Sequence, residues 1–360
     1  MSSDSEPGLH RDARSRFIHL DAGQRRERDA NVGTLVTILD APVAESVPFE
    51  ALFVAHYRAI RAIGRSASGA GVAVVAVHVP SCSLAARAWL GARPDAVASA
   101  ILGRHSEVDV LLDAPTLSLR HLALLVPPPA SWDAAGVTYE VIDLRTHQSF
   151  HDERGRPLEG AQAEGPAFFS CGPYALFFLP TGDASDWPEL ATDAWAMLPE
   201  RVLVRERAAE PDRWRRRGYA AREERDAGRS WSVITAIPAP LAVGEPLVAA
   251  GESAAGTLRI VSERGMRALA VGGEALSRGV LLGRYSRCDA SDVLGHDHIS
   301  RAHLLVKRVG DAIVAVDTAS TAGTYLEGEE HAVRSVAIGR GEVAVLGDDH
   351  ARVWWEPRER

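Results

Sequence analysis

Short apolar runs separated by turn residues fill residues 71–182 and indicate strands rather than helices. Runs of this length, bounded by Gly, Pro, Asp and Ser, are typical of an all-β sandwich. The runs are Val72–Val79, Ala98–Leu102, Val108–Leu112, Leu122–Val126, Tyr139–Ile142 and Leu176–Leu179. We therefore predict a first β-sandwich over residues 71–182.

A second β-rich region occupies residues 251–360. Its candidate strands are Thr257–Val261, Val280–Leu282, His303–Lys307, Ile313–Val316, Val333–Ile338, Val343–Leu346 and Val353–Trp355. The segment Leu-Gly-Arg-His-Ser at 102–106 recurs as Leu-Gly-Arg-Tyr-Ser at 282–286, and each copy is followed by Ser-x-x-His and an Asp-led turn. This repeat predicts one domain in two copies.

The remaining segments, 1–70 and 183–250, have a different pattern of apolar and polar residues. Residues 1–70 begin with a polar arm, followed by a short strand at Thr34–Leu39 and apolar residues from Phe49 to Ile63 at helical spacing. We expect this helix to pack on the next domain. Residues 183–250 are rich in Trp, Arg and Pro and predict a linker with some helix. The predicted fold class is mainly β, with two sandwiches, a partly helical linker and a short α/β extension at the N-terminus.

In the second copy, candidate hydrogen-bond donors stand where predicted strands begin or end. Arg284 follows Gly283, Ser300 and Arg301 precede His303, and Thr321 lies in the turn from Asp317 to Thr324. The loops of a sandwich gather at its two ends, so these side chains can converge on one anion. A phosphate with nearly two negative charges needs one guanidinium and several hydroxyl or amide donors, and this set provides them.

The ordered motifs of the second copy resemble those of the forkhead-associated family, whose pattern is Gly-Arg, then Ser-x-x-His, then a Ser-Thr-Asn-Gly-Thr-like turn. The resemblance covers about residues 256–357. It implies the following roles: phosphate contacts by Arg284, Ser300 and Thr321, assistance from Arg301 and Ser286, and structural support from Gly283, His303 and Gly323.

Both copies depart from the family pattern. Ala322 stands where the family places an Asn that clamps the main chain of the bound peptide, and Ala has neither amide donor nor acceptor. The first copy keeps Gly103 and His121 but has Leu119 where an Arg or another polar residue is usual. If one residue is dropped in its later turn, a weaker second site is predicted from Arg104, Ser118, Thr146 and His147.

Composition narrows the classes of function. The 360 residues carry a formal net charge of −8, which disfavours binding to nucleic acid or anionic lipid. The Arg-rich stretch 213–217 has acidic neighbours and is expected to be a solvated helix. Lys307 is the sole lysine, a bias typical of GC-rich bacterial genomes. The absence of long apolar runs predicts a cytoplasmic protein.

Other chemistry finds little support in the sequence. Three separated cysteines indicate neither disulfides nor zinc, and His296-Asp297-His298 alone does not specify a metal. Phosphate-cradling glycine loops, hydrolase elbows, zinc-protease helices and kinase loops are absent from the sequence. We therefore expect no enzyme activity and no cofactor.

The resulting prediction is a bacterial adaptor or scaffold that binds a phosphothreonine-containing partner, such as a Ser/Thr kinase or one of its substrates. A structural protein whose degenerate copies serve phosphorylation-independent interaction or self-assembly is the alternative, favoured by Ala322 and Leu119. A third possibility is catalysis by the unassigned N-terminal or central segment, for which the sequence offers no motif.

Overall fold

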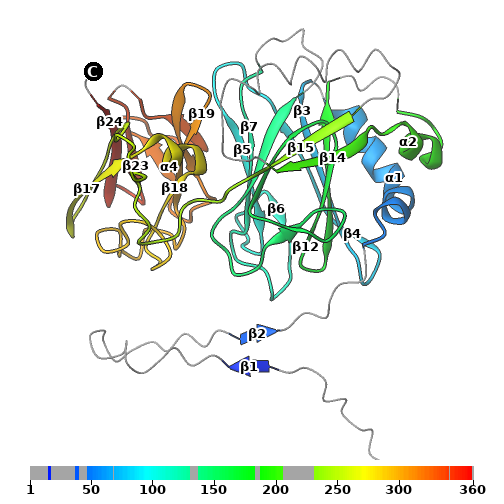
Figure 1. Cartoon of the computed structure of the whole chain (residues 1–360), viewed down its shortest axis with the longest axis horizontal. Helices are drawn as coiled ribbons and strands as arrows, with labels where there is room; N and C mark the ends of the chain where they lie inside the picture. The colour runs from blue at the N-terminus through cyan, green and yellow to red at the C-terminus, as the bar shows by residue number, and fades with distance from the viewer. Residues whose placement is uncertain are drawn as a thin grey trace, which may run out of the picture. The chain divides into compact units, whose positions relative to one another are not determined.

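A computed structural model describes residues 47–67, 69–129, 137–182, 187–205, 231–339 and 341–358, with two short strands before them. The chain divides into the compact units Met1–Ser46 and Val47–Arg360 (Figure 1). In the smaller unit, β1 (Ser15–Phe17) and β2 (Thr37–Leu39) pair antiparallel. The predicted strand at Thr34–Leu39 is thus present over its last part, and most of the predicted arm lies outside the described residues.

The larger unit begins with a helix and a first sandwich of two sheets. One sheet has the order β10 (Pro157–Leu158), β9 (Phe150–His151), β12 (Ala167–Cys171), β13 (Tyr174–Thr181), β3 (Gly71–His78) and β4 (Ser83–Gly91). The other has the order β14 (Glu200–Arg205), β15 (Trp231–Ile237), β11 (Gly160–Glu164), β8 (Thr138–Asp143), β7 (Leu122–Val126), β5 (Ala98–Gly103) and β6 (Val110–Leu111). Buried residues from both sheets, among them Leu124 and Phe178, form the core between them.

Helix α1 (Phe49–Ser66) covers the outer face of β3 and β13, as its apolar spacing predicts. Phe53 and its apolar neighbours pack on Phe168 and Phe177, and Trp195 of α2 (Ala191–Met197) joins this cluster. Glu50 in the first turn and Arg65 in the last complement the helix dipole. In the described part of the chain, neither this helix nor another is long and apolar enough to cross a membrane.

Two strands within the predicted linker, β14 and β15, are part of the first sandwich. Strand β15 pairs antiparallel with β11 and parallel with β14, so the sandwich extends from Gly71 to Ile237 instead of ending at 182. Ser232 and Ile234 are buried at alternate positions, the period expected of a strand. Residues 206–230, including the Arg-rich stretch, lie outside the described residues.

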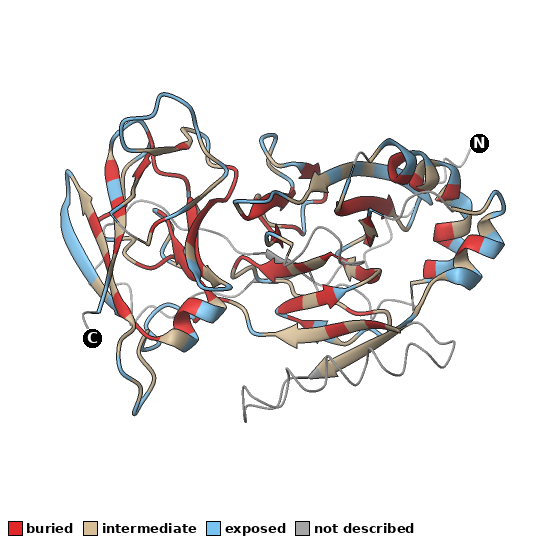
Figure 2. Cartoon of the chain, turned by 90° about the horizontal axis from the view of Figure 1, so that it is seen from above, coloured by how far each residue is buried: buried red, intermediate tan, exposed pale blue. Residues whose placement is uncertain are grey.

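The second sandwich has two sheets that contain the predicted strands and two strands that were not predicted, at 265–271 and 324–326. The first sheet has the order β17 (Gly265–Val271), β16 (Gly256–Ser262), β24 (Ala351–Pro357), β23 (Val343–Leu346) and β21 (Thr324–Leu326). The second has the order β18 (Val280–Leu282), β19 (Leu304–Val309), β20 (Ala312–Asp317) and β22 (Ser335–Ala337). Leu304, Val353 and Trp355 are core residues, and α4 (Gly273–Arg278) packs beside β19. Figure 2 shows the buried residues concentrated in the strands of both sandwiches.

The two sandwiches share a hydrophobic cluster formed by the outer faces of two sheets. Leu122 and Leu124 of β7 face their own core, whereas Ala123 and Leu125 face the second sandwich. In β19, Leu305 likewise points outward. The cluster comprises Val97, Ile101, Ala123, Leu125, Ile142, Leu144, Leu281, Cys288, Leu305, Val314, Val316 and Ala319. Continuous apolar runs such as Leu-Ala-Leu-Leu-Val signal this burial on both faces.

Candidate functional site

Two loops of the second sandwich bring the predicted donors together. Arg284 and Ser300 lie in the loop between β18 and β19, and Thr321 lies in the turn between β20 and β21. The backbone N–H of Thr321 donates a hydrogen bond to the hydroxyl of Ser300 at 3.0 Å. Ser300 is buried and Thr321 is exposed, so the pair lies at the boundary between the interior and the solvent. The structure therefore places both residues at the same end of the fold.

The residues predicted to support these loops have defined contacts. A Cβ on Gly283 would lie 2.3 Å from the carbonyl oxygen of Arg301, so only glycine fits this close approach. The Nδ1 of His303 accepts from the Ser300 amide at 3.0 Å, and its Nε2 lies 3.1 Å from the Gly323 carbonyl, to which it donates. One imidazole thus joins the two loops.

The His303 ring is neutral in the fold. The residue is fully buried, and burial lowers its pKa against a smaller opposing effect of the Asp317 carboxylate. A neutral ring with a proton on Nε2 satisfies both hydrogen bonds that His303 makes. His303 therefore has a structural role, which is to hold the two loops together.

Asp317 organises the turn that carries Thr321. Its carboxylate accepts hydrogen bonds from the amide and hydroxyl of Ser320, at 2.7 and 2.5 Å, and from the hydroxyl of Thr324 at 2.6 Å. Ala319 and Gly323 have φ angles of +58° and +78°, which bend the chain sharply on either side of Thr321. Ala322 is partly exposed next to Thr321 and offers no polar side-chain atom.

The positive charge of these loops is available to a ligand. The Arg284 side chain is 39% exposed, and its Nη1 lies 3.8 Å from a carboxylate oxygen of Asp297, which is 98% exposed. Such a surface pair is weak and exchanges readily with solvent. Arg301 and Ser286 are exposed as well. The loops therefore offer guanidinium and hydroxyl donors to an anion.

The first copy repeats the supporting geometry but not the free donors. A Cβ on Gly103 would lie 2.4 Å from the Leu119 carbonyl oxygen, and the Ser118 amide donates to His121 Nδ1 at 3.1 Å. The Nε of Arg104 donates to the Leu117 carbonyl at 2.8 Å. Part of the Arg104 guanidinium is therefore already bound to its own loop.

The structure corrects the alignment of the first copy's later turn. The hydroxyl of Thr146 donates to Asp143 at 2.6 Å and its amide to the same carboxylate, so Thr146 matches Ser320 and not Thr321. His147, the next residue, is exposed, and some loss of solvent around its ring together with the charge of Arg287 lowers its pKa. The predicted contact of Thr146 with phosphate does not fit these bonds.

One residue of the first copy reaches the candidate site and was missed by sequence analysis. Arg120 is 7% exposed and hydrogen-bonds both the Ala319 carbonyl and the Ser300 hydroxyl of the second copy. The sequence signal for this role is the place of Arg120 just before the apolar strand β7. A charged residue so close to a buried strand is expected to need a partner inside the protein.

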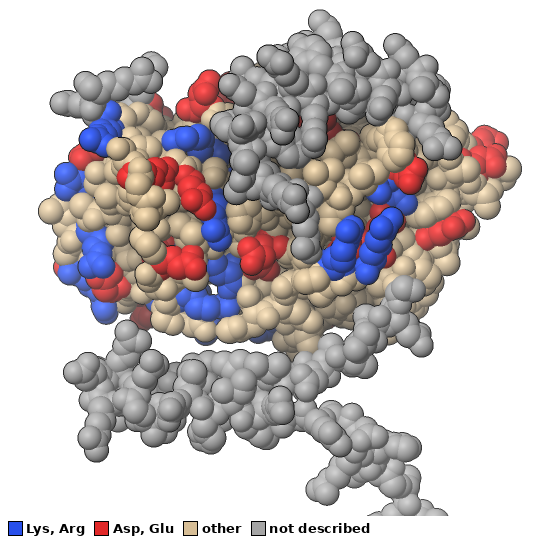
Figure 3. Space-filling view, in the orientation of Figure 1, with Lys and Arg blue, Asp and Glu red and all other residues tan. Residues whose placement is uncertain are grey.

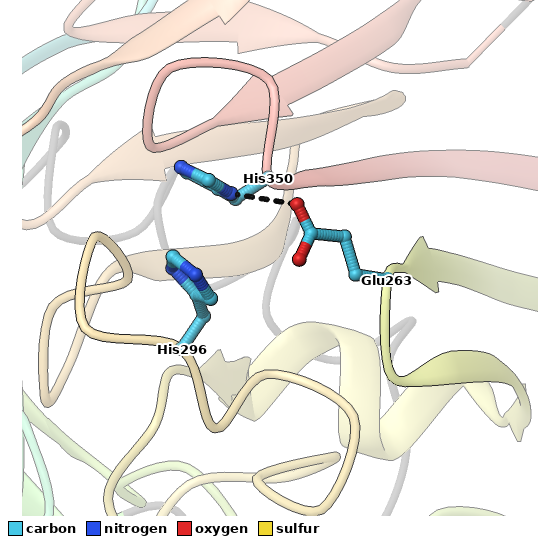
Figure 4. Close-up of side chains that lie close together, drawn as sticks. All are labelled: Glu263, His296 and His350. Atoms are coloured by element: carbon cyan, nitrogen blue, oxygen red, sulfur yellow. Dashed lines mark hydrogen bonds and ion pairs between the residues drawn. The ribbon is translucent and has the colours of Figure 1, made fainter.

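His296, in the β18–β19 loop, forms a cluster of ionisable side chains with Glu263 and His350 from two other loops (Figure 4). The Nδ1 of His350 lies 3.2 Å from a Glu263 oxygen, and the two imidazoles stack with centroids 3.9 Å apart and 22° between planes. A metal lies in the plane of each ring that binds it, and stacked rings have no such common point. These residues could hold a cation only after one ring turned.

Charges on the face seen in Figure 3 are mixed. Lys and Arg are interspersed with Asp and Glu over the second sandwich, and no continuous basic surface appears on the described residues of this face. Nucleic acid requires an extended basic surface, which this face does not offer.

Comparisons with known proteins agree with the motif. The FHA domain family matches residues 280–347, which include all the loops of the candidate site. Mycobacterium tuberculosis Rv1747 FHA-1 is 30% identical, over 29% of this chain and 100% of that chain, with a TM-score of 0.24. Mycobacterium tuberculosis EmbR in complex with a low-affinity phosphopeptide is 18% identical, over 29% and 25%, with a TM-score of 0.23. The yeast Dun1 FHA domain in complex with a doubly phosphorylated peptide is 16% identical, over 34% and 82%, with a TM-score of 0.27. Curated proteins gave no match.

Proposed function

Because the chain carries a forkhead-associated domain over residues 280–347, we propose that it is a phosphothreonine-binding adaptor or scaffold in bacterial Ser/Thr kinase signalling. Domains of this family are phosphopeptide-recognition modules. The proposed partner is a protein with a phosphorylated threonine in an accessible segment, such as a kinase or its substrate, met in the cytoplasm.

The convergence of Ser300 and Thr321 carries this proposal, and the Arg284 amide donates to the Ser300 carbonyl at 3.1 Å within the same loop. The Ser300–Thr321 hydrogen bond is 3.0 Å long, and the Asp297 carboxylate paired with Arg284 is 3.8 Å away and almost fully exposed. In the bound state, the Arg284 guanidinium and the Ser300 and Thr321 hydroxyls would donate to the phosphate oxygens, with Arg301 and Ser286 beside them. Charge-assisted hydrogen bonds of this kind are worth about 1.5–3 kcal/mol each.

Titration with a degenerate phosphothreonine peptide library tests the proposal. The wild type should bind the phosphorylated library and not its unphosphorylated counterpart, and Arg284→Ala should weaken binding about 10- to 100-fold. Arg259→Ala is the matched control, because Arg259 is similarly exposed (34%) and also paired with a carboxylate, that of Glu356. Binding that ignores phosphorylation, or equal losses in both variants, would reject the proposal.

A phosphorylation-independent interaction protein remains the second candidate, because Ala322 removes the amide expected to clamp the peptide. The first copy also fits this function better, since Arg104 and Thr146 are occupied by their own loops. The same titration separates the two functions: a structural protein would bind its partner equally with and without phosphate.

A further inference from the structure

Arg120 belongs to the first sandwich, yet its guanidinium lies within the loops of the second. Its Nε donates to the carbonyl oxygen of Ala319 at 3.0 Å, and its Nη2 donates to the same oxygen at 2.5 Å. The same Nη2 also lies 3.3 Å from the hydroxyl oxygen of Ser300, to which it donates. Both partners belong to the loops that form the proposed phosphothreonine site.

The contact with Ser300 determines what that hydroxyl can do. A serine hydroxyl has two acceptor lone pairs and one proton to donate. The Thr321 amide and the Arg120 guanidinium supply two donors to the Ser300 oxygen. The remaining capacity is the O–H proton, which must find an acceptor. Arg120 thus prepares Ser300 to donate to an anion such as phosphate.

The contact with Ala319 holds the second loop. Ala319 is buried and has a φ of +58°, an uncommon conformation for a residue with a Cβ. Two N–H groups of the planar guanidinium donate to its carbonyl oxygen, which fixes the orientation of this peptide unit. Thr321 follows two residues later, so the same arginine positions the turn that presents the Thr321 hydroxyl.

We propose that Arg120 is a positioning residue of the phosphothreonine site, so that the first sandwich completes the site of the second. This inference rests on the proposed function. The residue is 7% exposed and acts through Ser300 and Ala319, while Arg284, Arg301 and Thr321 remain exposed for the ligand. The degenerate copy then contributes to binding without a ligand of its own.

The same interface provides a matched control. The side chain of Arg145 in the first sandwich is also only 7% exposed and also reaches the second sandwich. It donates to the Arg287 carbonyl at 2.8 Å and to Asp289 at 2.7 Å, and it contacts neither Ser300 nor Ala319 in the described residues. Both acceptors lie in the β18–β19 loop, close in sequence to Ser286, so removal of Arg145 disturbs the interface and this loop but takes no hydrogen bond from Ser300 or Ala319.

The test compares Arg120→Met and Arg145→Met in the full chain, with the selected phosphothreonine peptide as probe. Arg120→Met should weaken peptide binding about 10-fold, whereas Arg145→Met should change it less than about 2-fold, although both lower the melting temperature. Arg120→Lys keeps the charge but not the planar fork, and should recover only part of the affinity. Unchanged binding in Arg120→Met, or equal losses in both methionine variants, would overturn the inference.

Amide hydrogen exchange at Thr321, measured without peptide, separates this inference from the proposed function. The Thr321 amide should exchange faster in Arg120→Met than in Arg145→Met, because only the first variant loosens its partner Ser300. Equal exchange in the two variants would count against the coupling. If Arg120→Met does not fold, Arg120→Lys takes its place in the comparison with Arg145→Met, and equal exchange in that pair would count against the coupling in the same way. A wild type that binds no phosphorylated peptide would reject the proposed function, and the exchange rates would still test the coupling.

Discussion

The amide of Thr321 donates to the hydroxyl of Ser300 across 3.0 Å, which joins two loops that are separated along the chain by strands β19 and β20. The bond makes each loop a support for the other. A ligand that binds both loops therefore meets a site whose donors are held in place before it arrives, which reduces the ordering that binding requires.

Ser300→Ala should weaken phosphothreonine binding by about 10-fold, less than Arg284→Ala. The change removes one donor to phosphate and the acceptor of the Thr321 amide, but it leaves the guanidinium charge. Isothermal titration of one selected peptide against both variants measures the order. A larger effect of Ser300→Ala than of Arg284→Ala would show that the loop bond matters more than the charge.

Gly283→Ala should destabilise the fold by about 1–3 kcal/mol, because the new Cβ would lie 2.3 Å from the Arg301 carbonyl oxygen and backbone atoms must shift. Urea unfolding of the full chain measures the loss. Gly339→Ala is the control, since a Cβ there meets nothing within 4 Å, and its stability should stay within about 0.5 kcal/mol of wild type. Equal stability of the two variants would contradict the close approach at Gly283.

Ala322→Asn should raise peptide affinity about 2- to 10-fold, because it supplies an amide at the position where the family pattern has one. Ala322→Leu adds a side chain of similar size without polar atoms and should give no gain. Titration with the phosphorylated peptide compares the three proteins. A gain in both variants would indicate added contact area and not an amide clamp.

His121 should make the fold sensitive to acid. Burial lowers its pKa from 6.5 to about 4. Between these pH values, His121 binds a proton in the unfolded chain but stays neutral in the folded chain. This contribution to stability is lost as the pH falls from 6.5 towards 4, by up to about 3 kcal/mol. Asp143 acts in the opposite sense between pH 6 and 3.8, because burial raises its pKa to about 6.

Comparison with His121→Gln isolates the histidine from Asp143. The free energy of unfolding of wild type minus that of His121→Gln, from urea unfolding at pH 7 and pH 4.5, should decrease on acidification. A difference that does not change with pH would mean that His121 carries its proton equally in the folded and unfolded chain.

The second sandwich and its loops were predictable because the signals are local. Gly283, His303 and Asp317 each occupy a strand end where backbone geometry demands that residue type, and their spacing follows the strands. The structure places the predicted donors Ser300 and Thr321 within one hydrogen bond of each other. Short-range chemistry of this kind is visible in a single sequence.

The features that the sequence did not reveal depend on contacts between distant segments. Strand β15 pairs with β11, from which it is separated in sequence by a segment rich in Arg and Trp. Its short alternating pattern was therefore assigned to the predicted linker. Arg120 and Arg145 have no local partner that explains them, because their acceptors lie in the other sandwich. The alternation of apolar and polar residues predicts which face of a sheet a side chain lies on. It does not predict which segment of the chain packs against that face.

The sheet of β18, β19 and β20 is buried on both faces, by its own core and by the first sandwich. The second sandwich is not built to stand alone, since its removal from the chain would expose Leu281, Leu305 and Val316 to water. The two sandwiches are therefore expected to be inherited together, as one unit of the chain.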